Sequence, residues 1–170
     1  MIGAVVLAAG AASRFGRPKQ VELLPRVLER LAEADVAPVV VVEGAHELPP
    51  QPGGVTVVRC GAWADGPGAS LRCGLAALPG EATHALVVLA DGPLLDPRAV
   101  ARVAAHTADA DVVAASYDGT RSHPVALART VWDRIPAEGA RALRPALVDC
   151  SDLHAPGDVD TPGDLAQLER

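Results

Sequence analysis

The stretch from residue 2 to residue 19 reads IGAVVLAAGAASRFGRPK. It opens with a valine-rich apolar run, residues 2–7, which is typical of a strand buried on both faces. Small residues follow at once, and Arg14, Arg17 and Lys19 then fall within six positions. Small residues let backbone N–H groups approach phosphate oxygens, and the cations add fixed positive charge. We therefore expect a phosphate-binding loop after a buried first strand; the alternative is a flexible Gly/Ala turn with solvated basic residues.

Two familiar phosphate loops are excluded by their spacing. The pattern GxxxxGK[ST] fails because Gly10 and Gly16 are too far apart and because Gln20 follows Lys19. The dinucleotide-binding pattern GxGxxG does not occur in the sequence. A dehydrogenase is therefore a weak alternative.

Strand-like and helix-like segments alternate along the rest of the chain. We expect strands over residues 36–42, 55–58, 85–90, 111–116 and 123–128. We expect helices over residues 24–34, 69–78, 97–106 and 161–169, and a helix over 131–143 that Pro136 interrupts. This alternation predicts one three-layer α/β/α domain over residues 1–170, with a mostly parallel sheet between two helical layers.

Composition and charge narrow the function classes. The chain has 170 residues, of which 49% are hydrophobic, and this is enough for one continuous core. Its net charge of −6 argues against a nucleic-acid or anionic-membrane binder, because both functions need a basic surface. The apolar start is too short to span a bilayer and has no basic segment before it. Since no metal spacing links Cys60, Cys73 and Cys150, we expect a cytoplasmic protein with reduced cysteines and no zinc.

Carboxylates occur where two later segments end. Asp91 follows the apolar run ALVVLA, and Asp158 and Asp160 precede a closing helix that Thr161 and Asp164 should cap. A carboxylate at the end of a buried strand is costly unless it is hydrated, paired or bound to a metal. Ligands bind beyond the carboxyl ends of parallel strands, so Asp91 and one of the later pair are candidates for a Mg²⁺ site. The alternatives are a turn-forming Asp91 and solvated loop acids.

Together these motifs resemble the MobA-like NTP transferase family, in particular its molybdenum cofactor cytidylyltransferase branch. The family signature, LAAG followed by a Ser/Arg-Phe/Met-Gly-x-Pro-Lys segment, matches residues 7–10 and 13–19. Later motifs occur in the family's order, namely ADGPGASLRCGL at 64–75, DGP at 91–93, SHPV at 122–125, EGAR at 138–141 and DVDTP at 158–162. The resemblance spans nearly the whole chain and implies a Rossmann-like nucleotidyltransferase fold.

The resemblance also implies a role for each matching residue. Arg14 and Lys19 would hold the triphosphate, and Asp91 would act with them in catalysis. Asp91 and Asp160 would place Mg²⁺. In the family, Ala-Ala-Gly at the end of the signature is associated with CTP. The residues expected to bind the nucleotide are Leu7, Ala8, Ala9, Gly10, Gly66 and Ser70.

The second substrate is expected to contact His123 and Arg141. For His123, a strand-edge residue restricted by Pro124 is an equal alternative. The sequence departs from the family in a shorter segment after Lys19 and in two substitutions, Gly92 within the DGP motif and Ser122 before His-Pro. These departures lie where the second substrate should dock.

The implied activity is Mg²⁺-dependent transfer of a nucleoside monophosphate, with CMP from CTP favoured. The acceptor would be a small phosphorylated molecule, molybdopterin in the first instance, and pyrophosphate would leave. A partner enzyme that receives the product is a further expected contact. Two alternatives stay open: another acceptor, such as a sugar phosphate or another cofactor precursor, and a nucleotide-binding protein without catalysis. The short segment after Lys19 favours the second alternative, and the retained charged residues oppose it.

Overall fold

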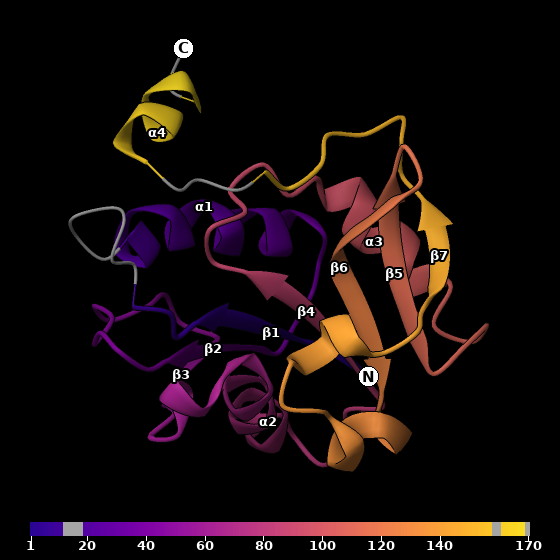
Figure 1. The fold of residues 1–170 in the computed structure, drawn as a ribbon, viewed down its shortest axis with the longest axis horizontal. Helices are drawn as coiled ribbons and strands as arrows, with labels where there is room; N and C mark the ends of the chain where they lie inside the picture. Colours follow the sequence, from indigo (N-terminus) through magenta and orange to yellow (C-terminus); the bar gives the residue numbers. More distant parts are fainter. Residues whose placement is uncertain (12–18, 158–160, 169–170) are drawn as a thin grey trace.

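Seven strands form one sheet in the part of the chain that the structure describes (Figure 1). The structure is a computed structural model and describes residues 1–11, 19–157 and 161–168. The strands lie in the order β3-β2-β1-β4-β6-β5-β7. Their bounds are β1 Ile2–Ala8, β2 Val39–Glu43, β3 Val55–Arg59, β4 His84–Leu89, β5 Val112–Tyr117, β6 Thr120–Ala128 and β7 Ala146–Asp149.

Most neighbouring strands are parallel. This holds for the pairs β1–β2, β1–β4, β2–β3 and β5–β7. The exception is β6, which runs antiparallel to β4 and β5. A tight turn returns the chain from β5 to β6, and its residues Asp118 and Gly119 have φ of 51° and 77°, as hairpin turns of this length require. The predicted mostly parallel, Rossmann-like α/β fold is confirmed.

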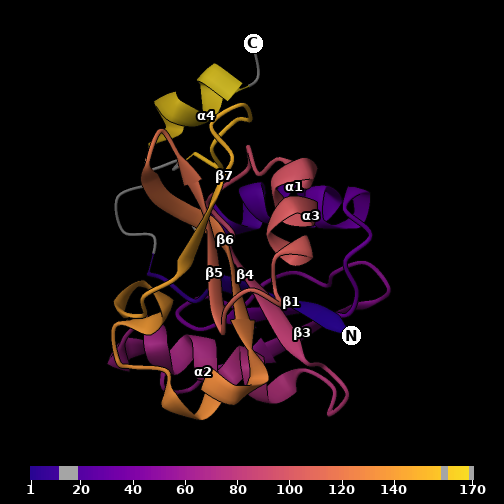
Figure 2. The ribbon, with the colours of Figure 1, turned by 90° about the vertical axis from the view of Figure 1, so that its right-hand side faces the viewer.

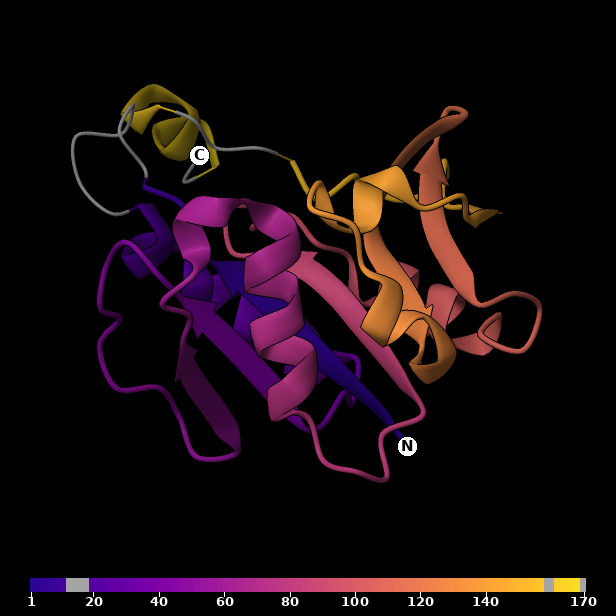
Figure 3. The same cartoon turned by 60° about the horizontal axis from the view of Figure 1, so that its bottom comes forward.

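Helices cover both faces of the sheet. Figure 2 shows the sheet on edge, with α1 and α3 on one side and α2 on the other, and Figure 3 shows α2 lying across β1 and β2. The α-helices are α1 Lys19–Glu33, α2 Pro67–Ala77, α3 Pro97–Ala105 and α4 Pro162–Leu168. Short 3₁₀ helices are η1 Trp63–Asp65, η2 Arg129–Arg134 and η3 Gly139–Ala142.

Alternating side chains of β1 belong to two separate cores. Val6 packs in the core under α1 and α3, and Val5 packs in the core under α2. On the second face, Gly74 lets α2 come close to the sheet, because a Cβ there would lie 2.4 Å from Cγ1 of Val5 and 2.8 Å from Cγ2 of Val42. Side chains packed on both faces of the sheet therefore fix the position of β1 relative to its neighbours, β2 and β4.

Helix α1 begins at Lys19, five residues before the start expected from the apolar pattern. Its buried stripe extends back through Leu23 to Gln20, which is only 6% exposed. A polar residue on that stripe carries no hydrophobic signal, so the sequence pattern misses the first turn. Pro25 is inside the helix but on its exposed side, where water can satisfy the carbonyl that loses its partner.

The chain after β6 also differs from the expected elements. The helix expected over 131–143 is replaced by η2 and η3, separated at Pro136 as expected. The edge strand β7 is not anticipated by the sequence, because only one of its four residues is buried and no alternation is visible. Helix caps agree with the sequence: Asp96 accepts from the N–H of Arg98 at 2.9 Å, and Thr161 accepts from the N–H of Asp164 at 3.3 Å.

Cys60 and Cys73 form a disulfide, with their Cα atoms 5.8 Å apart. The expectation of reduced cysteines is therefore wrong for this pair. The chain leaves β3 at Cys60, passes through η1 and returns along α2, and this reversal brings two residues 13 positions apart together. No local spacing rule reports such proximity, which depends on the packing of α2. Cys150 is a free, buried thiol.

We predict that Gly68→Ala destabilises the fold. A Cβ at this position would lie 2.0 Å from the carbonyl oxygen of Pro136 and 2.8 Å from that of Ala137, which are backbone atoms and cannot rotate away. Overpacking of this kind costs about 1–3 kcal/mol, and urea unfolding should show a loss of that size. Gly80→Ala is the control, because no neighbour lies within 4 Å of the added methyl group in the described structure. Equal stability of the two variants would contradict the packing of α2 on the segment before η3.

Candidate active site

The carboxyl ends of β1 and β4 lie side by side. The parallel ladder pairs Leu7 with Leu89, and the N–H of Ala90 donates to the carbonyl of Leu7 at 3.1 Å. Residues that follow these two strands therefore emerge at the same edge of the sheet. In folds of this class ligands bind at that edge.

An ion pair joins two sequence motifs at this edge. Nζ of Lys19 lies 3.0 Å from Oδ2 of Asp91, and the two side chains are 12% and 26% exposed. Lys19 begins α1 and is the only lysine in the sequence, whereas Asp91 follows β4. Because both groups are mostly buried, their attraction is less screened than that of a surface pair. The site thus offers a positive group, Lys19, that could contact a phosphate, and a negative group, Asp91, that could contact a cation.

The loop after β1 lies against the chain that follows β2. Ala9 is 7% exposed, whereas Gly10 is exposed. The N–H of Ala45 donates to the carbonyl of Ala9 at 3.3 Å. A Cβ on Gly44 would lie 2.9 Å from Cβ of Ala9 and 2.5 Å from Cβ of Trp63. Glycine at position 44 therefore allows η1 to pack close to the β1 loop.

Helix α2 begins at the same end of the sheet. Gly66 precedes its first residue and has φ of 114°, a conformation that favours glycine. Ser70 lies in the first turn of α2 and is 4% exposed. Gly66 directly follows η1, whose Trp63 lies close to Gly44 and Ala9, so the start of α2 lies at the edge that carries Ala9.

A pocket of about 190 Å³ lies beside Asp91. Gly92 contributes to it from the chain after β4, and Ser122 and His123 contribute from β6. Pro156 and Gly157 close one side; the N–H of Leu94 donates to the carbonyl of Pro156 at 2.9 Å. Three segments distant in the sequence therefore meet around one cavity. Its lining is Val88, Leu89, Gly92, Leu95, Ser122, His123, Pro156 and Gly157.

His123 is neutral at ordinary pH. The pKa of His123 is lowered to about 4, mainly by burial and also by the charge of Arg121, while the charge of Asp91 partly opposes these two effects. The imidazole therefore offers the pocket a hydrogen-bond donor and an acceptor rather than a positive charge.

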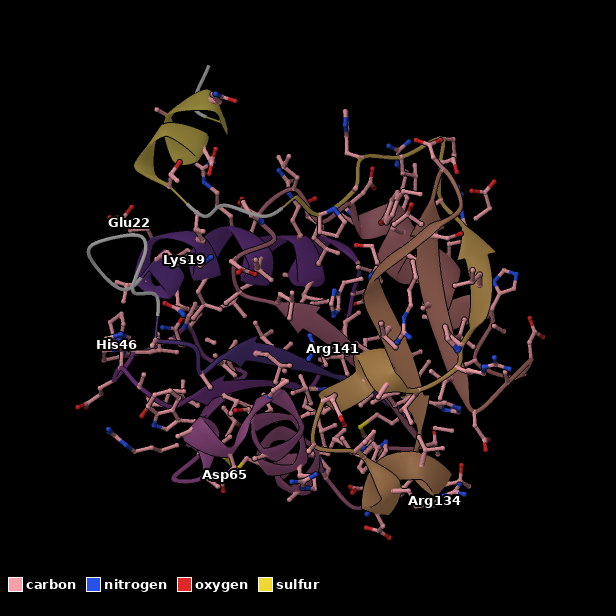
Figure 4. The ribbon with its side chains drawn as sticks, in the orientation of Figure 1. Lys19, Glu22, His46, Asp65, Arg134 and Arg141 are labelled. Carbon is pink, nitrogen blue, oxygen red and sulfur yellow. A yellow bond between two sulfur atoms is a disulfide. The ribbon has the colours of Figure 1, made fainter. Side chains whose placement is uncertain are left out.

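Arg141 lies on η3, apart from the ion pair. Figure 4 shows Lys19 at the start of α1 and Arg141 well separated from it, in front of the sheet. The side chain of Arg141 is exposed. The structure therefore does not bring Arg141 to Lys19, although both belong to motifs of the expected site.

Arg14 and Asp160, which the sequence predicts to bind the triphosphate and the metal, lie outside the described residues, as does Asp158. Described residues flank them on either side. Lys19 follows the first gap, and Gly157 precedes the second and packs against Leu94. Lys19 and Gly157, which border these gaps, thus both lie at the edge that carries Asp91.

Sequence reasoning missed residues that organise the site through backbone carbonyls. Arg121 donates to the carbonyl oxygens of Ala140 and Leu143, both at 2.7 Å, and so holds η3 in place. Gln20 and His46 donate to the loop after β1. Isolated polar residues bound to backbone atoms belong to no motif. Only Gln20 could have been found from the sequence, because it is a polar residue in line with the apolar residues of α1.

The family model for the MobA-like NTP transferase domain matches residues 4–151. The chain therefore belongs to the MobA-like NTP transferase family, a nucleotidyltransferase family whose fold and signature loop it shares. A search of curated proteins finds no match.

Solved structures of similar fold cover almost the entire chain. Rv0371c from Mycobacterium tuberculosis H37Rv is 28% identical, with a TM-score of 0.78 over 98% of this chain and 96% of that one. A manganese complex of Rv0371c is 25% identical, with a TM-score of 0.71 over 98% and 97% of the two chains. 2-C-methyl-D-erythritol 4-phosphate cytidylyltransferase from Thermus thermophilus shares the fold at 20% identity, with a TM-score of 0.69 over 99% of this chain and 98% of that one.

Within the described ranges, no helix has the length and apolar content needed to cross a membrane.

We predict that His123 makes the fold sensitive to acid between pH 6.5 and about 4. An unfolded histidine binds its proton near 6.5, whereas the pKa of folded His123 is about 4. In this window the unfolded state binds more protons, so the free energy of unfolding falls as the pH drops. Urea unfolding at about pH 7 and about pH 5 should show a smaller fall for His123→Gln than for the wild type.

The exposed His106 provides the control for this prediction. His106→Gln should keep the wild-type fall in stability between the two pH values, because this side chain lies at the surface at the end of α3 and does not line the pocket. An unchanged fall in His123→Gln would contradict the assignment of a neutral, half-buried imidazole to the pocket.

Proposed function

We propose that residues 1–170 form one Mg²⁺-dependent nucleotidyltransferase domain. It transfers a nucleoside monophosphate, CMP from CTP in the first instance, to a small phosphorylated acceptor, with molybdopterin favoured, and releases pyrophosphate. The observation that carries this proposal is the ion pair between Lys19 and Asp91, at 3.0 Å, beside the signature loop. It joins the two motifs that the chemistry needs, a phosphate-binding cation and a metal-binding carboxylate.

The donor set at this edge fits Mg²⁺. This ion is commonly held by one or two carboxylates together with phosphate oxygens and water. Asp91 supplies one partly exposed carboxylate, and Asp160 is proposed as the second, because only two positions separate it from Gly157 beside the pocket. Among the described residues, no group of three or more His, Cys, Asp or Glu side chains is placed to hold a metal ion. When bound, Mg²⁺ would neutralise charge on the polyphosphate.

In the proposed reaction an acceptor phosphate oxygen attacks the α-phosphorus of the NTP in line. The bond from that phosphorus to the bridging oxygen breaks, and pyrophosphate leaves with the bonding electron pair. An ionised phosphate is already nucleophilic, so no dedicated general base is needed. Lys19 and Arg14 bind the triphosphate, orient it and balance the charge of the leaving group.

The nucleotide and the acceptor are proposed to bind on opposite sides of Asp91. On one side are the β1 loop, Gly66 and Ser70, where Ala9 favours CTP. On the other side is the pocket that contains His123. Since the pKa of His123 is about 4, its ring suits the amide or ring nitrogen of a heterocycle better than a phosphate, which supports a pterin-like acceptor. Because η3 holds Arg141 apart from the ion pair, Arg141 is proposed to contact the pterin of the acceptor rather than its reacting phosphate.

The proposal predicts that Asp91→Asn and Lys19→Ala lose activity and remain folded. Removing one preorganised charge from such a site typically lowers the rate by about 10²–10³. Pyrophosphate release with saturating Mg²⁺ and CTP would measure the loss, and circular dichroism would report the fold. Asp109→Asn and Arg134→Ala, which change exposed charges elsewhere, are matched controls and should keep full activity. Near-normal turnover in both site variants would overturn the proposal.

A second measurement separates the alternatives. Thermal shift against CTP, GTP, ATP and UTP with Mg²⁺ should show the largest stabilisation with CTP, because binding to the native state raises its stability. Pyrophosphate release with molybdopterin would then identify the acceptor. Release with a sugar phosphate instead would identify the other acceptor class, and stabilisation without release for any acceptor would identify a binding protein. No shift with any nucleotide would contradict all three.

A further inference from the structure

Three consecutive carbonyl groups in the loop after β1 each accept a hydrogen bond from outside the loop. The carbonyl of Ala9 accepts from the N–H of Ala45 at 3.3 Å. That of Gly10 accepts from Nε2 of Gln20 at 3.0 Å. That of Ala11 is 2.8 Å from Nε2 of His46, and this nitrogen must be the donor because a carbonyl can only accept.

These bonds determine where the loop's N–H groups point. In a trans peptide the C=O and the following N–H are antiparallel, and the bonds from Ala9 to Gly10 and from Gly10 to Ala11 are trans. The N–H groups of Gly10 and Ala11 are therefore turned away from the donors that hold the carbonyls. Both residues are exposed, and no acceptor among the described residues takes either N–H.

We propose that Gln20 and His46 are positioning residues that hold the β1 loop with the N–H groups of Gly10 and Ala11 directed at the bound NTP. This inference rests on the proposed function. Gln20 reaches the loop from the first turn of α1, next to Lys19, and His46 reaches it from the chain after β2. Figure 4 shows Lys19 and His46 at the same end of the molecule. Residues 9–11 are thus fixed from two elements before the nucleotide arrives, so their N–H donors need little rearrangement on binding.

The burial of Gln20 is a second, independent observation. Gln20 is 6% exposed and occupies the apolar stripe of α1 with Leu23 and Leu24. Its Oε1 is buried and has no hydrogen-bond partner in the described structure. An apolar side chain would fill this position without leaving a polar atom unsatisfied. Packing therefore does not explain a glutamine here, whereas the bond from its Nε2 to Gly10 does.

The test compares variants that remove each donor. Gln20→Met keeps the length of the side chain and cannot donate, and His46→Phe keeps a planar ring and cannot donate. Titration of each variant with CTP and Mg²⁺ should give an affinity about tenfold below that of the wild type, the effect of losing one well-placed hydrogen bond. The thermal midpoint without nucleotide should be unchanged in His46→Phe and unchanged or higher in Gln20→Met, which loses its unsatisfied oxygen.

Two controls separate positioning from a general structural effect. His46→Gln retains an amide donor and should recover most of the affinity. His106→Phe removes another imidazole whose ring nitrogen lies 2.8 Å from a backbone carbonyl, that of Arg102, in α3 and away from the loop, and it should bind CTP as the wild type does.

The outcomes distinguish this inference from the function on which it rests. Wild-type affinity in both Gln20→Met and His46→Phe, in a protein that binds NTP, would overturn this inference alone. Failure of His46→Gln to recover affinity would overturn the role of His46 as a donor. If the wild-type protein binds none of the four NTPs, the proposed function and this inference are overturned together.

Discussion

Hydrogen bonds between β1 and β4 set Leu7 beside Leu89, and the arrangement at the carboxyl edge of the sheet follows from that register. A shift of one residue would turn Val5 and Val6 toward the opposite cores, because side chains alternate along a strand. Both cores are filled, one by α1 and α3 and the other by α2. Packing on two faces therefore fixes the register of the strands, and with it the positions of their carboxyl ends. Lys19 and Asp91 meet because β1 and β4 end side by side.

The pairing of Lys19 with Asp91 reflects the cost of a charge in a partly buried place. A carboxylate at the end of a buried strand is unfavourable alone, and removing one member of such a pair leaves the other uncompensated. The same two groups suit a polyphosphate with its metal ion. The ammonium group of Lys19 can contact phosphate oxygens, and the carboxylate of Asp91 can contact the metal. Structural stability and the proposed chemistry thus place the same requirement on these two residues.

Backbone carbonyls are the second means by which the site is organised. Arg121 fixes η3 through Ala140 and Leu143, and Gln20 fixes the β1 loop through Gly10. In each case a side chain from a regular element satisfies carbonyls of an irregular segment, which would otherwise depend on water. Irregular segments held in this way keep their shape without regular hydrogen-bonded structure, so the residues proposed to bind substrate on them need little rearrangement.

The sequence by itself determined the order of β1 to β6 and of α1 to α4, the caps at Asp96 and Thr161, and the motifs that identify the family. These features are local, because periodicity, capping and loop composition act over a few neighbouring residues. The sequence did not predict the start of α1, because Gln20 interrupts the apolar pattern. It did not predict β7, because one buried residue gives no alternation.

Only the tertiary structure decided that Lys19 pairs with Asp91, that Cys60 joins Cys73, and that His123 shares a pocket with residues after β4 and beyond β7. Each of these facts depends on which elements become neighbours. That choice follows from the combined packing of two cores and not from the spacing of residues along the chain.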